Sequence, residues 1–114
     1  MSEIFDQYEL DYGELRSELS VKVAAIASLS GELRAGKVSE VEHDVAEGEA
    51  LLRRMELEAR TLGAAQKTQL MSKVKAYRVE LVNLKSEARS AASGRAASDA
   101  ARAELGLGDG GAGE

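Results

Sequence analysis

The sequence contains no proline, no cysteine and no tryptophan, and only 4% of its 114 residues are aromatic. Without proline, the strongest helix breaker is missing, so long helices are permitted. Without cysteine, a disulfide scaffold and a thiolate zinc site are excluded, which agrees with a reducing compartment. The few aromatic residues and the scattered valines also disfavour a β-sandwich or a β-barrel.

Long apolar runs and an excess of positive charge are missing as well. No segment approaches the roughly 18 consecutive apolar residues of a transmembrane helix. The net charge of −5 argues against a general nucleic-acid binder, which needs a basic surface. The acidic N-terminus is unlike a signal peptide, and Ser2 stands where myristoylation requires glycine. We therefore expect one small soluble domain.

What the sequence does contain is three segments rich in helix formers, each with apolar residues recurring in steps of 3 and 4. Only Lys22 interrupts the first stripe, and Val23 beside it can supply the missing apolar surface. Such stripes lie on one face of a helix and require partner helices. The stripes are Phe5, Tyr8, Tyr12, Leu15, Leu19, Lys22, Ile26 and Leu29; Val38, Val41, Val45, Gly48, Leu52, Met55, Ala59 and Leu62; and Leu70, Val74, Tyr77, Leu81, Leu84 and Ala88.

Turn signals divide the stripes. Ser30-Gly31 closes the first segment, with the glycine suited to a left-handed C-cap, and Gly63 ends the second. The second helix begins either near Ser30 or at Ser39. We expect helices at about 3–29, 33–62 and 65–91, with connections so short that neighbours are antiparallel. The predicted fold class is all-α, an antiparallel up-down-up three-helix bundle over 1–92, followed by a flexible Ala/Gly-rich linker over 93–114.

Charge is divided unevenly along the chain. Residues 1–28 carry six acidic and two basic residues, whereas residues 64–92 carry six basic and two acidic residues. Pairing between helices explains this division most simply, and a polarised surface that steers a charged partner is the alternative.

Residue patterns for catalysis or metal binding find little support. His43 is the single histidine and falls opposite the apolar stripe, so a metal site or triad has no second histidine or cysteine. The acidic cluster at 40–49 lacks the glycine-centred loop of an EF-hand, and the C-terminal glycines follow no strand. We expect no enzymatic activity, no metal and no cofactor.

Several apolar residues fall outside the stripes. With the second stripe at heptad positions a and d, Leu57 falls at f and points outward. On the third helix Val79 falls at f and Val82 at b, beside Arg78, and Leu10 of the first helix is a more isolated case. Apolar residues ringed by arginines on adjacent helices predict a small docking patch, although single exposed apolar residues are also ordinary. The arginines around Leu57 are Arg53, Arg54 and Arg60.

Four segments carry a family resemblance. Residues 51–62 (LLRRMELEARTL) resemble the end of the second helix in the N-terminal domain of Vti-family Qb-SNARE proteins, particularly the plant-type members. Residues 4–9 (IFDQYE) are similar to the family's start, 73–78 (KVKAYR) to its third helix and 100–105 (AARAEL) to the stretch before the SNARE motif. Gly63-Ala64-Ala65 replaces the usual Pro-Pro, which changes the turn. No SNARE heptad helix or anchor follows, so the chain resembles an isolated Habc-type domain, either a fragment or a truncated product.

The resemblance implies a regulatory, adaptor-binding domain of a SNARE. The full-length protein would act in vesicle-mediated transport and membrane fusion between trans-Golgi network, endosomes and vacuole or lysosome, on the cytoplasmic face of those membranes. Its implied partners are proteins: an ENTH-domain, epsin-related adaptor and, through the missing SNARE motif, other SNAREs.

Binding to nucleic acid and direct membrane insertion of this fragment are not expected, and the domain is expected to be a monomer. The alternatives are an unrelated three-helix scaffold and a self-associating coiled-coil module. The expected contact face lies on the second and third helices and comprises Arg53, Leu57, Arg60, Arg78, Val79 and Val82.

Overall fold

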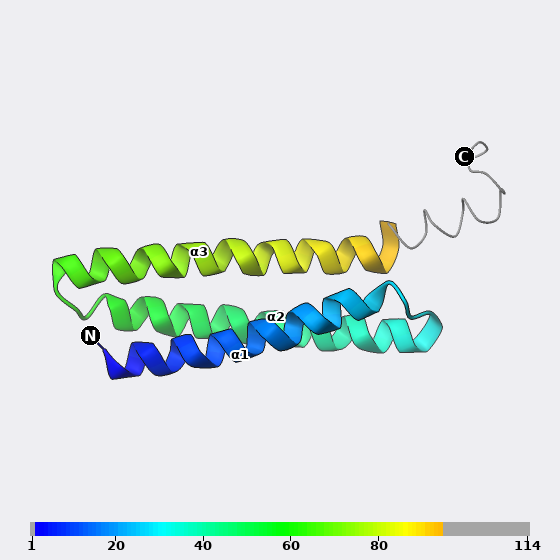
Figure 1. The fold of residues 1–114 in the computed structure, drawn as a ribbon, viewed down its shortest axis with the longest axis horizontal. Coiled ribbons are helices and arrows are strands. Elements are labelled where there is room, and N and C mark those ends of the chain that lie inside the picture. The colour runs from blue at the N-terminus through cyan, green and yellow to red at the C-terminus, as the bar shows by residue number, and fades with distance from the viewer. Residues whose placement is uncertain (1, 95–114) are drawn as a thin grey trace.

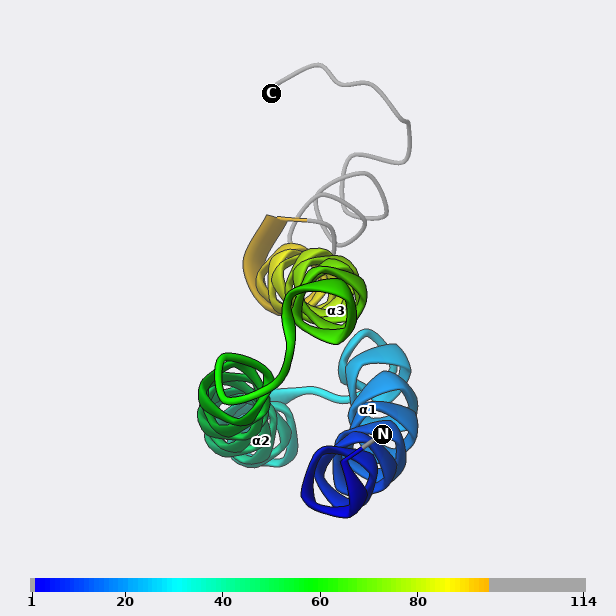
Figure 2. The same ribbon diagram turned by 90° about the vertical axis from the view of Figure 1, so that its left-hand side faces the viewer.

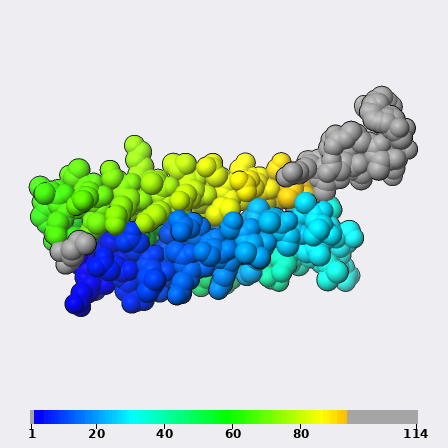
Figure 3. Space-filling view, in the orientation of Figure 1, coloured from blue at the N-terminus to red at the C-terminus, as the bar shows by residue number. Residues whose placement is uncertain are grey.

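Three long helices run up, down and up in the structure, a computed structural model that describes residues 2–94 (Figure 1). They are α1 (Glu3–Ile26), α2 (Gly31–Ala59) and α3 (Ala64–Arg89), and a short π-helical segment, Ser90–Gly94, extends α3. Seen end-on, the helices occupy the corners of a triangle, and α1 is tilted so that its end lies nearer to α3 than its start (Figure 2). In the space-filling view, the side chains of α3 border those of α1 (Figure 3). The predicted fold class is confirmed. Residues 95–114 of the predicted linker lie outside the described residues.

The core consists of the three predicted stripes, which meet along the axis of the bundle. Val23 is buried beside the half-buried Lys22, as the sequence indicated. Within residues 2–94, no helix is long and apolar enough to cross a bilayer. The buried apolar residues are Phe5, Tyr12, Leu19, Val23 and Ile26 of α1; Val41, Val45, Leu52, Met55 and Ala59 of α2; Leu70, Val74, Leu81 and Ala88 of α3; and Ala91 beyond it.

The start of α1 is capped by Ser2. Its hydroxyl accepts a hydrogen bond from the Phe5 N–H at 2.9 Å, which satisfies one of the unpaired amides of the first turn. The same hydroxyl donates to Glu58 of α2 at 3.1 Å. One side chain therefore begins α1 and also ties it to the end of α2.

The connection from α1 to α2 differs from the prediction. α1 ends at Ile26, three residues earlier than expected, because the Ser28 and Leu29 amides bond to carbonyls three residues back and tighten the chain into a turn. Gly31 has the left-handed φ of +57°, but it opens α2 behind the N-cap Ser30 and does not cap α1, so that prediction was wrong. Of the two predicted starts of α2, the one near Ser30 is correct.

The connection from α2 to α3 also begins earlier than predicted. α2 ends at Ala59, and the Thr61 and Leu62 amides bond to carbonyls three residues back. The Thr61 hydroxyl donates to the Glu58 carbonyl at 2.7 Å, which fixes this turn. Four residues, 60–63, then reverse the chain, and Gly63 is the N-cap of α3. The short turn holds the end of α2 against the start of α3, where the candidate site lies.

Gly48 allows the three helices to approach one another at the middle of the bundle. A Cβ atom at this position would lie 3.1 Å and 3.2 Å from the two terminal carbons of Leu81, and 3.5 Å from Leu15 Cδ2. The glycine costs helix propensity relative to alanine, but it leaves the space that Leu81 of α3 fills. The predicted stripe included Gly48 as a core position. Because Leu81 already fills the space beside it, the core needs no larger side chain at this position.

The polar interruption of the first stripe is matched by a polar residue of α2. The Lys22 ammonium lies 2.8 Å from Asp44 Oδ2 and 3.6 Å from Glu40 Oε1. Asp44 is only 7% exposed, so its charge depends on this partner. The hydrogen bond to Asp44 raises the pKa of Lys22 above its ordinary value. Because the pair gives the buried Asp44 and the half-buried Lys22 each a partner of opposite charge, it favours one register of α1 against α2.

Two tyrosines carry the polar contacts between α1 and α3. The rings of Tyr12 and Tyr77 pack with centroids 4.8 Å apart. The Tyr12 hydroxyl donates to the Tyr77 carbonyl at 3.0 Å, and the Tyr77 hydroxyl donates to the Glu9 carboxylate. Two ion pairs flank the rings: Arg16–Glu80 at 3.1 Å and Lys73–Glu9 at 3.3 Å. The opposite charges of the first and third segments are thus used, in part, for pairing.

We expect the stability of the bundle to fall as pH rises above 10. Burial raises the pKa of Tyr77 to about 12, helped by its hydrogen bond to Glu9, and burial together with the Glu80 carboxylate raises the pKa of Tyr12 further. A raised phenol pKa means that the folded state favours the neutral phenol. This stabilisation is complete below the unfolded pKa of about 10 and is lost as pH rises through the folded values.

Urea unfolding at stepped pH from neutrality upward measures this effect, with the phenolate absorbance followed in parallel. The double variant Tyr12→Phe/Tyr77→Phe is the control, since it keeps the lysines and Tyr8 but lacks the two phenols that pack between α1 and α3. If the free energy of unfolding of the wild type falls no more steeply with pH than that of the double variant, ionisation of Tyr12 and Tyr77 is not coupled to unfolding.

Candidate protein-docking site

The six residues predicted as a contact face all lie on the neighbouring surfaces of α2 and α3. Leu57, Val79 and Val82 are 66%, 55% and 63% exposed, and the bundle core does not cover them. The predicted register is confirmed on α2, because Leu52, Met55 and Ala59 are fully buried while Leu57 points outward. We call the set Arg53, Leu57, Arg60, Arg78, Val79 and Val82 the docking face.

The structure connects two of its arginines through one glutamate. Glu56 lies 2.6 Å from Arg60 one turn further along α2, and 2.6 Å from Arg78 across the seam on α3. The Arg60 guanidinium, joined by Arg78, holds the pKa of the Glu56 carboxyl below its usual range. Glu56 therefore stays ionised and orients both arginines. The sequence reasoning missed this residue, although its position four residues before Arg60 was a usable signal.

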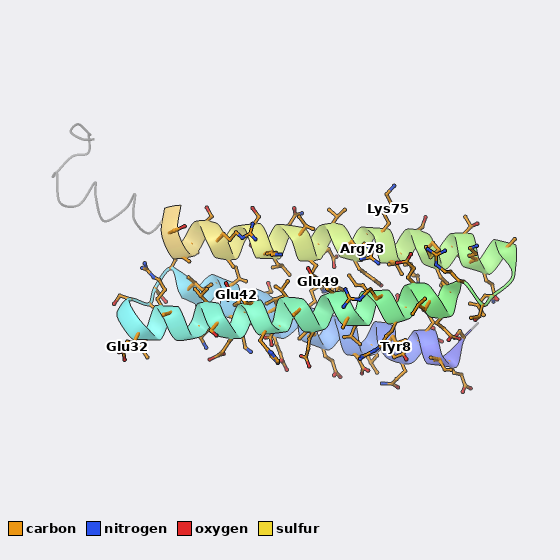
Figure 4. All side chains as sticks on the ribbon, turned by 180° about the vertical axis from the view of Figure 1, so that it is seen from behind. Tyr8, Glu32, Glu42, Glu49, Lys75 and Arg78 are labelled. Carbon is orange, nitrogen blue, oxygen red and sulfur yellow. The ribbon has the colours of Figure 1, made fainter. Side chains whose placement is uncertain are left out.

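The six residues do not form one continuous patch. Arg53, Arg60 and Val82 occupy heptad positions that flank the α2–α3 seam. Arg78 reaches across the seam from α3 to Glu56 of α2, and Figure 4 shows it between the two helices. Leu57 and Val79 occupy f positions, which point away from the bundle axis on their own helices. The docking face is accordingly a row of arginines along the α2–α3 seam. Leu57 lies at its outer edge on α2, Val79 lies at its outer edge on α3, and Val82 lies between these two edges.

A groove beside the docking face was not predicted. It measures about 470 Å³ and lies over the α2–α3 seam close to the turn at 60–63. Met71 and Val74 supply its apolar part, while Lys67, Lys75 and Arg78 supply positive charge. The residues that line it are Glu56, Lys67, Thr68, Met71, Ser72, Val74, Lys75 and Arg78. Reading the helices one at a time could not reveal it, because both helices contribute.

A second groove, of about 550 Å³, lies over the same seam at the other end of the bundle. There the small side chains of Ala88 and Ala92 face the valines of α2, so the helices leave space between them. Its walls carry opposite charges: Glu42 and Glu49 stand on α2 (Figure 4), and Lys85 and Arg89 on α3. Within the described part of the chain, no ion pair joins α2 to α3 at this end of the seam, whereas Glu56 and Arg78 form one near the 60–63 turn.

Among residues 2–94, one group of side chains is close enough to be considered for metal binding. The ligand atoms of His43, Asp44 and Glu47 lie within 4.8 Å of one another. His43 is exposed, as predicted, and Asp44 is already hydrogen-bonded to the Lys22 ammonium. A metal would have to displace that ammonium from the most buried ligand, so these residues fit the Lys22 ion pair better than a cation site.

Comparison with known proteins identifies the chain. A family model described as the vesicle transport v-SNARE protein N-terminus matches residues 1–92. The chain belongs to this family. The resemblance to Vti-family SNAREs is confirmed, and this v-SNARE N-terminal domain is a member of a non-enzymatic family of vesicle-transport proteins.

Relatives from plants and animals support the assignment. The v-SNARE N-terminal domain is 41% identical over 105 residues to vesicle transport v-SNARE 11 of Arabidopsis thaliana, covering 92% of this chain and 47% of that protein. It is 32% identical over 111 residues to the Mus musculus protein "vesicle transport through interaction with t-SNAREs homolog 1A", covering 97% of this chain and 50% of the relative. The chain thus spans about half the length of the curated relatives that it matches.

A solved structure shares the fold. The solution structure of an N-terminal domain of Vti1a from Mus musculus superposes with a TM-score of 0.68, covering 75% of this chain and 84% of that one, at 24% identity. The v-SNARE N-terminal domain therefore has the three-helix architecture of that domain.

Proposed function

We propose that this v-SNARE N-terminal domain is the regulatory, adaptor-binding part of a SNARE that acts in membrane fusion between trans-Golgi network, endosomes and vacuole or lysosome. In this proposal an ENTH-domain, epsin-related adaptor docks on the docking face and recruits the SNARE for transport. The remainder of the protein would contribute the pairing with other SNAREs.

The observation that supports this function best is the exposure of Leu57 among oriented arginines. Arg60 and Arg78 are held by Glu56, so a partner does not have to order them on binding. Leu57 lies in the same helical turn as Glu56 and is 66% exposed, so it can enter a pocket of the partner without disturbing the core. Arginine is one of the residues enriched at interface hot spots, and the exposed leucine beside it offers apolar surface that a partner can bury.

We expect Leu57→Asp to weaken the binding of an ENTH-domain adaptor by a factor of about 30, the size of a typical hot spot of about 2 kcal/mol. The reason is that the substitution replaces apolar contact with an unpaired charge, while the folded bundle loses nothing. Isothermal titration calorimetry with the purified ENTH domain measures the dissociation constant.

Leu10→Asp is the matched control, because Leu10 is 58% exposed on α1, away from the docking face. Circular dichroism and light scattering establish that both variants remain helical and, as we propose for the wild type, monomeric. Equal losses in both variants, or no loss in Leu57→Asp, would remove the docking face as the adaptor site. A stable dimer of the wild-type chain would instead favour the self-associating alternative.

A further inference from the structure

The groove near the 60–63 turn carries positive charges that the bundle itself does not use. Lys67 and Lys75 line it and make no ion pair among residues 2–94, whereas Arg78 on the same rim is engaged by Glu56. Figure 4 shows Lys75 projecting from α3 into solvent while Arg78 reaches toward α2. Two ammonium groups are therefore free to meet charges from outside this part of the chain.

No unengaged carboxylate of this part of the structure opposes those ammonium groups within the groove. Its single acidic residue is Glu56, which already serves Arg60 and Arg78. The two acids of α3, Glu80 and Glu87, line a different groove on the α1 side of the helix, together with Arg16. The groove by the turn consequently has a net positive rim.

The same groove has an apolar floor and neutral hydrogen-bonding groups. Val74 is buried at its base, and Met71 is half-buried there, where its flexible thioether side chain can adapt to a partner. The hydroxyls of Thr68 and Ser72 stand on the α3 side. An apolar floor inside a basic rim matches a ligand with an apolar side chain at its centre and carboxylates around it.

We propose that this groove binds a short acidic segment of a partner protein that carries one large apolar side chain. The apolar side chain lies on Met71 and Val74, and the flanking carboxylates meet Lys67 and Lys75. A recessed, partly apolar groove favours a peptide over the flat headgroup layer of an anionic membrane, since headgroups would reach the lysines but leave the floor uncovered. The site goes beyond the adaptor contact proposed above, because it shares only Arg78 with the docking face.

The test uses the full 114-residue chain and a blocked peptide probe, acetyl-Glu-Asp-Leu-Asp-Glu-amide, followed by amide chemical shifts in NMR. We expect shifts confined to the first half of α3 and the facing turn of α2. We also expect Lys67→Gln/Lys75→Gln to weaken binding about tenfold, given the modest contribution of each exposed charge pair. Raising the ionic strength to about 1 M shortens the Debye length to about 3 Å and should also weaken the binding of the peptide to the wild-type chain.

The matched control is Lys85→Gln/Arg89→Gln, which removes the same charge from the same helix at the other groove and should bind like wild type. Equal losses in both double variants would mean that only net charge matters, and would overturn the proposal. So would unchanged binding of a probe with serine in place of leucine, because the floor would then play no part. Binding of the chain to phosphatidylserine vesicles that depends on Lys67 and Lys75, without peptide binding, would assign the groove to lipid instead. Because the probe is a free peptide and Leu57 is untouched, failure here is separate from failure of adaptor docking.

Discussion

We expect Leu81→Ala to lower the free energy of unfolding by about 2–5 kcal/mol, the range for truncating a buried leucine. Leu81 is 4% exposed and fills the space opposite Gly48, so its removal opens a cavity between α2 and α3. A glycine on the opposite wall cannot move a side chain into that cavity, which places the loss toward the upper end. Urea unfolding followed by circular dichroism measures it.

Two further variants decide whether the loss arises at this contact. Val82→Ala changes the next residue, which is 63% exposed, and should change stability by less than about 0.5 kcal/mol. Gly48→Ala added to Leu81→Ala should recover about 1 kcal/mol, since the new methyl group gains helix propensity and no longer meets the leucine. Similar losses of stability for Leu81→Ala and Val82→Ala would mean that α3 does not bury the face that carries Leu81.

We expect Lys22→Met to cost about 3 kcal/mol, the lower end of the range for removing one partner of a buried ion pair. The Asp44 side chain, which is 9% exposed, would then stay buried without the ammonium that now lies 2.8 Å away. Because Lys22 is itself half-buried at the rim, water can relieve part of the penalty, and the upper end of the range is not reached. The measurement is the same equilibrium unfolding experiment at neutral pH.

Removing both charges should restore stability. The double variant Lys22→Met/Asp44→Leu is expected to unfold within about 1 kcal/mol of wild type, because an apolar pair of similar size needs no compensating partner. Such a result would mean that the ion pair selects the register of α1 against α2 and adds little to the free energy of unfolding. A loss below about 0.5 kcal/mol for Lys22→Met alone would show instead that Asp44 is adequately solvated.

The candidate site could be predicted only in part. The outward positions of Leu57, Val79 and Val82 followed from the heptad register, since a residue opposite the apolar stripe of a helix faces water wherever the helix packs. The shared role of Glu56 did not follow, because it depends on Arg78 standing across the seam. The Lys67–Lys75 groove is also invisible in the sequence, since it forms only where Glu56 of α2 lies against the first half of α3.

The ends of the helices were predicted less well than their faces. The stripe predicted α1 to Leu29 and α2 to Leu62, but each helix stops three residues earlier. An apolar residue at stripe spacing stays partly buried even when the chain has already entered a turn, as Leu29 and Leu62 do. Ser28 and Thr61 bond to carbonyls three residues back at these two ends, and such local bonds compete with the next helical turn.

The spacing of apolar residues was enough to predict three antiparallel helices and the buried face of each. It also predicted four of the exposed apolar residues, Leu10, Leu57, Val79 and Val82, but not Ile4, Val21 and Leu33. Those properties depend on spacing within one helix, and an α-helix repeats every 3.6 residues in any protein. Three contacts could be seen only in the packed bundle: Lys22 meets Asp44, Leu81 fills the gap at Gly48, and Glu56 joins Arg78 to Arg60. These pairs depend on the register of one helix against another, which is set by contacts between residues 22 to 33 positions apart in the chain.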